Sequence, residues 1–74
     1  MTKSELLIEL DRLMQLRSGT LTGTEDLESL GWDSIAVLEF IALMSSVAKK
    51  RVAGKDVTAC KTVSDLLVLA GMAG

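Results

Sequence analysis

Apolar residues recur at helical spacing in three stretches of the chain, and polar or glycine-containing segments separate them. The first stretch places five apolar residues on one side of an α-helix: Leu6, Leu7, Leu10, Leu13 and Met14. Before it, Thr2 and Glu5 have the spacing of a capping box, which satisfies two backbone amides that the first turn leaves unpaired. The pattern predicts a first helix over about residues 3–16.

The second stretch predicts a helix over about residues 33–48, with Asp33 as a strong N-cap and Trp32 packed on Val37 as a hydrophobic staple. Six apolar residues are expected to face the core: Val37, Phe40, Ile41, Met44, Val47 and Ala48. The opposite side mixes aliphatic and polar residues: Ile35, Leu38, Glu39, Ala42, Ser45 and Ser46. Such a mixture is typical of a transient docking surface, but isolated exposed aliphatics are also normal, so the pattern leaves both interpretations open.

The third stretch predicts a final helix over about residues 63–70, capped by Thr62 and Asp65 and ended by Gly71. Its apolar residues share one face: Val63, Leu66, Leu67 and Ala70. A short helix is expected over about residues 55–60. Because no alternating strand pattern occurs between these segments, the sequence predicts an all-α fold, a small bundle of three to four helices.

Residues 17–32 form a long connection between the first two long helices. A connection of this length within a small domain is usually functional or held by its own side chains. Four apolar residues are expected to hold it: Leu21, Leu27, Leu30 and Trp32. Thr22 and Glu25 again have capping-box spacing, which predicts a short helical turn near residues 24–30.

Length and composition limit the function. A chain of 74 residues is expected to form one small domain, residues 1–74. It contains no His, no Tyr and a single Cys, so we expect neither catalysis by the chain itself nor a metal site. Cys60 is interpreted as a small core residue in a reducing compartment. Because a signal-peptide core and a membrane span are both lacking, we expect a cytoplasmic protein, and nothing demands more than a monomer.

Charge is distributed unevenly. Residues 25–48 carry five carboxylates and no basic residue, whereas residues 49–61 carry five basic residues and one carboxylate. The acidic stretch argues against a nucleic-acid partner and makes a helix-turn-helix DNA-binding protein the weakest alternative. The basic stretch is interpreted as a solvated surface, although it could contact a phosphate.

Ser34 is the candidate for chemistry. If Asp33 is the N-cap, Ser34 occupies the first helical position and its hydroxyl is not needed to complete the helix. A phosphate ester there would lie beside unpaired N–H groups and the positive end of the helix dipole. The alternative, that Ser34 merely shares the capping, stays open on these grounds.

The segment around Ser34 resembles the Gly-x-Asp-Ser-Leu motif of acyl carrier proteins: Gly31, Trp32, Asp33, Ser34 and Ile35. The resemblance extends to chain length, to helix order, to Glu39 and to the segment Thr62–Leu66 that opens the last helix. It implies a bundle of the acyl-carrier type and a single carrier domain. It also implies that Ser34 receives 4′-phosphopantetheine from coenzyme A through a separate phosphopantetheinyl transferase.

In such a carrier, the thiol of the prosthetic group holds an acyl intermediate as a thioester, and the chain is not itself an enzyme. The resemblance implies acyl-loading and acyl-processing enzymes of fatty-acid-like, polyketide or other secondary-metabolite synthesis as partners. We expect these partners to dock on five residues: Asp33, Ile35, Leu38, Glu39 and Ala42. Two alternatives are an aminoacyl or peptidyl carrier and a helical adaptor that is never modified.

This chain departs from the usual acyl-carrier pattern at three places. Ile35 stands where Leu is commonest, which is a conservative change. Ala36 stands where many members have Asp or Glu. The segment that is usually acidic after the serine helix is polar or basic here: Ser45, Ser46, Lys49, Lys50 and Arg51. Because charge at the rim of an interface mainly sets encounter rate and specificity, we expect a specialised carrier with a dedicated set of partners.

Overall fold

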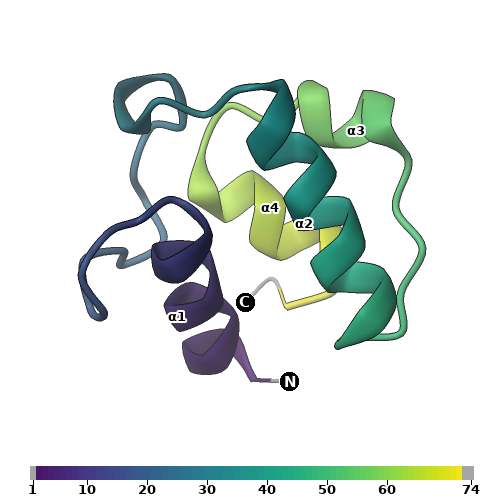
Figure 1. The fold of residues 1–74 in the computed structure, drawn as a ribbon, viewed down its shortest axis with the longest axis horizontal. Coiled ribbons are helices and arrows are strands. Elements are labelled where there is room, and N and C mark those ends of the chain that lie inside the picture. Colours follow the sequence, from purple (N-terminus) through teal and green to yellow (C-terminus); the bar gives the residue numbers. More distant parts are fainter. Residues whose placement is uncertain (1, 73–74) are drawn as a thin grey trace.

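A computed structural model describes residues 2–72, which form four α-helices and one 3-10 turn (Figure 1). The order is α1 (Lys3–Leu13), η1 (Glu28–Leu30), α2 (Ser34–Ser46), α3 (Gly54–Thr58) and α4 (Val63–Leu69). Helix α2 packs against α1 and α3, and α3 packs against α4. The residues described contain no strand, only an isolated bridge between Asp26 and Thr62. The predicted all-α bundle is therefore confirmed.

Helix α1 begins with the predicted capping box and ends earlier than predicted. The Thr2 hydroxyl accepts from the Glu5 amide at 3.2 Å, and the Glu5 carboxylate accepts from the Thr2 amide at 2.9 Å. The expected end near residue 16 is wrong because Gln15 adopts a left-handed conformation with φ 59°. The Leu16 amide then donates to the Asp11 carbonyl at 2.7 Å, which closes the helix in a Schellman-type turn.

Helix α2 is slightly shorter than the predicted range 33–48, because Asp33 is the N-cap and Val47 the C-cap. The inward side is largely as predicted, with Phe40 and Met44 fully buried. The prediction that Val47 faces the core is wrong. Its side chain is 51% exposed, because it follows the last residue of α2 and lies beyond the turn that faces the core.

The two C-terminal helices also differ from prediction only at their ends. The short helix begins one residue earlier than predicted and ends at Thr58 rather than at residue 60. Helix α4 has the predicted capping box of Thr62 and Asp65 and ends at Leu69. Gly71 ends it as predicted, since its φ of 77° suits glycine and lets the Met72 amide donate to the Leu67 carbonyl at 2.9 Å.

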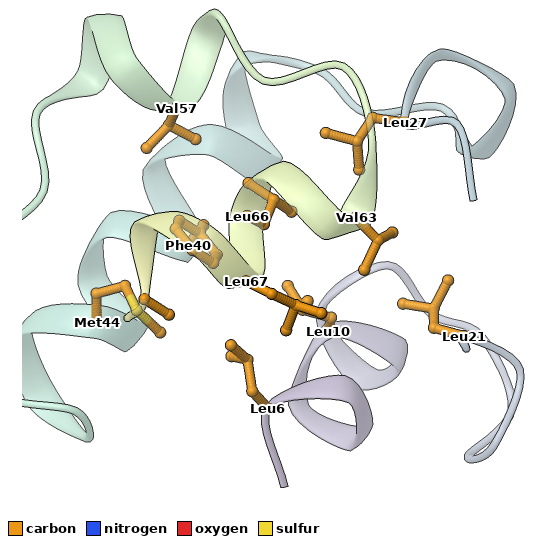
Figure 2. Packing of buried hydrophobic residues seen from close by; sticks show 11 residues of the cluster. Leu6, Leu10, Leu21, Leu27, Phe40, Met44, Val57, Val63, Leu66 and Leu67 are labelled. Carbon is orange, nitrogen blue, oxygen red and sulfur yellow. The ribbon is translucent and has the colours of Figure 1, made fainter. Parts of the chain in front are cut away.

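The core gathers apolar side chains from all four helices and from the long connection (Figure 2). Its fully buried members include Leu6, Leu10, Phe40, Val57, Val63 and Leu66. Cys60 is only partly buried against this cluster, and its thiol donates to the Asp56 carbonyl at 3.3 Å. Burial and two nearby carboxylates raise the pKa of the Cys60 thiol, so it is a weak nucleophile.

The long connection is held to the core as predicted, by leucines. Leu21 and Leu27 are buried, and Leu30 and Trp32 are partly buried against the cluster. The backbone adds two links to the segment before α4, because the Leu27 amide donates to the Lys61 carbonyl and the Val63 amide to the Glu25 carbonyl, each at 2.9 Å.

Two carboxylates also hold this connection, and the role of the first, Asp11, was not predicted from the sequence pattern. Asp11, buried in α1, accepts from the Gly19 amide at 2.8 Å and from the Leu21 amide at 3.1 Å. Glu25 pairs with Thr22 as the spacing predicted, and it accepts from the amides of Thr22 and Gly23 at 2.8 and 2.9 Å, but no helix begins there. The helical turn predicted near residues 24–30 is η1, at the end of that range.

Candidate functional site

Ser34 is the first residue of α2 and is exposed to solvent. Asp33 alone caps the helix, since its Oδ1 accepts from the Ala36 amide at 2.9 Å. The Ser34 hydroxyl makes no hydrogen bond with any residue in the range 2–72. The structure thus favours a free hydroxyl at the positive end of a helix over the alternative in which Ser34 shares the capping.

The segment before Ser34 is positioned by a tight turn. Gly31 has a φ of 81°, which a residue with a Cβ adopts only under strain, although a Cβ there would meet no other atom within 4 Å. The following Trp32 amide donates to the Leu27 carbonyl at 3.1 Å, and its indole contacts the Phe40 ring edge-on, with centroids 6.2 Å apart. The turn therefore holds the start of α2 against the core.

A shallow hollow of about 280 Å³ adjoins Ser34 between the start of α2 and α3. It is lined by Trp32, Asp33, Ser34, Val37 and Thr58. The indole Nε1 of Trp32 is buried and has no hydrogen-bond partner among the residues described. The sequence pattern does not predict Thr58 at this position, because only the packing of α3 against α2 brings it there.

The outward face of α2 is exposed, as the pattern predicted. Ile35 and Leu38 are 65% and 66% exposed. Glu39 and Ala42 are exposed on the same helix, and Asp33 is exposed at its start. All five residues expected to dock partners are thus accessible along one helix.

Charge divides the two ends of α2. Asp33 and Glu39 lie near Ser34, whereas Lys49, Lys50 and Arg51 follow the C-terminal end and are exposed. Within residues 2–72 the only ion pair joins Arg12 and Glu9 at 3.5 Å, so neither charged group is neutralised by the chain. Both remain accessible to a partner.

Three surface carboxylates have lowered pKa values because backbone amides bind them. Amides of Gly23 and Thr22 lower the pKa of Glu25 to about 2. Amides of Lys61 and Thr62 lower the pKa of Asp65, and the Thr2 amide lowers that of Glu5. These carboxylates hold helix starts and the long connection, and none of them adjoins Ser34.

In the part of the chain that the structure describes, no group of three metal-ligating side chains comes together. None of the helices described has the length and apolar character needed to cross a membrane.

Comparison with known proteins identifies one family. The family model described as "Phosphopantetheine attachment site" matches residues 5–68, which is most of the chain. The match includes Ser34 and all five residues of the predicted docking set. Comparison with curated proteins and with solved structures gives no match.

Proposed function

The chain belongs to the family of phosphopantetheine attachment domains, and we propose that Ser34 is the residue to which its prosthetic group is joined. Domains of this family are carriers rather than catalysts, and they hold 4′-phosphopantetheine covalently. Bound in this way, the group supplies a thiol that forms thioesters. The proposal depends on one observation, the free and exposed hydroxyl of Ser34 at the start of α2.

The surroundings of Ser34 fit such a group. The first turn of α2 leaves backbone amides unpaired, and a phosphate there gains roughly 0.3–1 kcal/mol from the helix dipole. Asp33 offsets part of this gain because its carboxylate has the same sign. The adjoining hollow offers both apolar carbon and polar atoms, from Val37 and Thr58, to an arm that contains both kinds of group.

Ser34 needs no neighbouring base for this role. It reacts once, in the active site of a separate phosphopantetheinyl transferase. There its hydroxyl loses a proton and the oxygen attacks the phosphorus of coenzyme A that bears the pantetheine arm, the phosphoanhydride bond breaks, and adenosine 3′,5′-bisphosphate leaves. The exposed face of α2 provides the docking surface for that transferase and for later partners, through Asp33, Ile35, Leu38, Glu39 and Ala42.

The cargo we propose is an acyl group, carried between enzymes of fatty-acid-like, polyketide or other secondary-metabolite synthesis. The Asp33–Ser34 pair supports this over an aminoacyl or peptidyl cargo, because peptidyl carriers more often have two glycines before the residue that precedes the serine. We also propose that the protein acts as a monomer in the cytoplasm, where a single thiol, Cys60, stays reduced.

The test is intact-mass spectrometry after incubation with coenzyme A and a broad-specificity phosphopantetheinyl transferase. We expect one phosphopantetheine adduct on the wild type and none on Ser34→Ala. Ser64→Ala is the matched control, since Ser64 is also an exposed serine in the first turn of a capped helix, and it should be modified fully. An unmodified wild type would favour the adaptor function instead.

The same assay tests the docking surface. Leu38→Asp should keep the fold close to its original stability, because Leu38 is 66% exposed, and should slow modification without preventing it. The initial rate of adduct formation measures this effect, and circular dichroism confirms the fold. A modification rate equal to that of the wild type would remove Leu38 from the docking surface.

A further inference from the structure

A basic surface lies just beyond the C-terminal end of α2, and the proposed function does not use it. It consists of four exposed residues: Val47, Lys49, Lys50 and Arg51. They begin the connection that runs along the outside of the molecule to α3 (Figure 1), and residues 45–53 contain no carboxylate. Because α2 has 13 residues, about 20 Å of helix separate this surface from Ser34. It is therefore distinct from the predicted docking set, which ends at Ala42.

One cation of the basic surface, Lys50, is held by the fold itself. Its amide donates to the Met44 carbonyl at 2.8 Å. Its ammonium lies beside Gly71, where a Cβ would be 3.3 Å from Nζ. Gly71 follows the end of α4, and a cation is favourable at the negative C-terminal end of a helix. Lys50 therefore links the ends of α2 and α4, and the fold accounts for its charge.

The other three residues of the basic surface have no comparable role. Within residues 2–72 neither Lys49 nor Arg51 takes part in an ion pair. Val47 is 51% exposed, although it is aliphatic. Two free cations close in the chain to an exposed aliphatic side chain are complementary to the reverse arrangement, an aliphatic residue with carboxylates beside it.

The position of the basic surface favours an acidic protein segment over other anionic ligands. A helix ends in carbonyls, so this end of α2 lacks the unpaired amides with which helix N-termini bind phosphate. A long polyanion such as DNA or RNA would also meet the five carboxylates of residues 25–48. Binding to a membrane surface requires a broad apolar face, and Val47 is the one apolar residue among the four.

We propose that the basic surface docks an acidic segment of a partner protein, whose carboxylates pair with Lys49 and Arg51 and whose aliphatic side chain packs on Val47. This interaction goes beyond the carrier function, because it uses neither Ser34 nor the outward face of α2. The Ser34 end of α2 is acidic and the far end is basic. A partner with the opposite order of charges therefore fixes the direction of α2, since like charges disfavour the reversed orientation.

The test uses a short peptide in which one leucine is flanked by glutamates, titrated into the unmodified isotope-labelled protein at about 0.15 M salt. We expect backbone amide shifts in the nuclear magnetic resonance spectrum to centre on Val47, Lys49 and Arg51. A matched peptide with glutamine in place of glutamate keeps the shape and should bind about tenfold more weakly, because two exposed charge pairs are lost. No binding of the glutamate peptide, shifts centred elsewhere, or equal affinity of both peptides would overturn the proposal.

Variants of the protein locate the charges that matter. Lys49→Gln and Arg51→Gln should each weaken the glutamate peptide about threefold and leave the urea-unfolding midpoint unchanged, because both side chains are exposed. The matched control is Arg17→Gln, which removes an exposed cation without an ion pair from the long connection and should leave the affinity unchanged. A loss of affinity in Arg17→Gln equal to that in Arg51→Gln would show non-specific attraction and overturn the proposal.

Phosphatidylserine vesicles and a single-stranded oligonucleotide test the other anionic ligands. At the same salt concentration, the protein should bind both more weakly than the glutamate peptide. Binding of either that is as tight as that of the peptide would overturn the proposal and assign the surface to a membrane or a nucleic acid. The carrier function fails separately, since it depends on modification of Ser34, whereas the peptide is added to the unmodified protein.

Discussion

The connections on either side of α2 differ in how they are held. The long one before α2 has two buried leucines, Leu21 and Leu27, and two carboxylates that bind backbone amides. The shorter connection after α2 is basic, and its residues Lys49 to Arg51 are exposed. The Lys50 amide donates to the Met44 carbonyl of α2 at 2.8 Å. Length therefore does not determine how firmly a connection is held. Buried side chains and hydrogen-bonded amides hold the connection that leads to Ser34.

The largest loss of stability is expected when a buried apolar side chain that holds the long connection is removed. Leu27→Ala should cost roughly 2–5 kcal/mol, because Leu27 is 2% exposed and the cavity left behind cannot be filled by a surface loop. Val52→Ala, its counterpart in the basic connection, should cost about 1 kcal/mol or less, since Val52 is only partly buried. Urea unfolding measures the free energy of unfolding of both variants. Equal losses of stability would show that the two connections are held alike.

An intermediate effect is expected when the buried carboxylate is removed. Asp11→Ala should cost about 1–3 kcal/mol, because it leaves the amides of Gly19 and Leu21 without their acceptor. Hydrogen exchange of these two amides should speed up more than that of Phe40. The control is Asp56→Ala, which removes an exposed carboxylate. Unchanged protection of Gly19 and Leu21 would contradict the assigned role.

The smallest expected effect depends on pH. The folded state lowers the pKa of Glu25 from 4.5 to about 2, so Glu25 contributes stability above pH 4.5 and loses that contribution as the pH falls toward 2. The exposed position limits the contribution to about 1 kcal/mol. Glu25→Gln should thus be less stable than the wild type at pH 7 and equally stable near pH 2. Direct titration of the Glu25 carboxyl resonance with a midpoint near 4.5 would contradict this.

Predictions for the helices succeeded where the structure depends on local interactions. The helices followed from local patterns, because caps such as Thr2 with Glu5 and Thr62 with Asp65 act within four residues, and apolar spacing marks the buried face. The exposure of Ile35 and Leu38 followed from the same spacing. Helix ends were less predictable. Gln15 ends α1 without a glycine to mark the turn.

The candidate site has one part that local sequence patterns predict and another that depends on packing between helices. Ser34, Asp33 and the exposed face of α2 could be found in the sequence, because their positions depend on one helix and its cap. The hollow beside Thr58 could not, since it is formed by residues from two helices that only packing brings together.

By itself, the sequence determined that this chain forms helices, where α2 begins, and that a serine occupies its first position. Those properties arise from hydrogen bonds and side-chain periodicity over a few residues. The tertiary structure alone decided that Asp11 holds the long connection, and that Leu13 and Ala36 line a hollow between α1 and α2. These depend on contacts between distant segments, whose partners a local pattern does not specify.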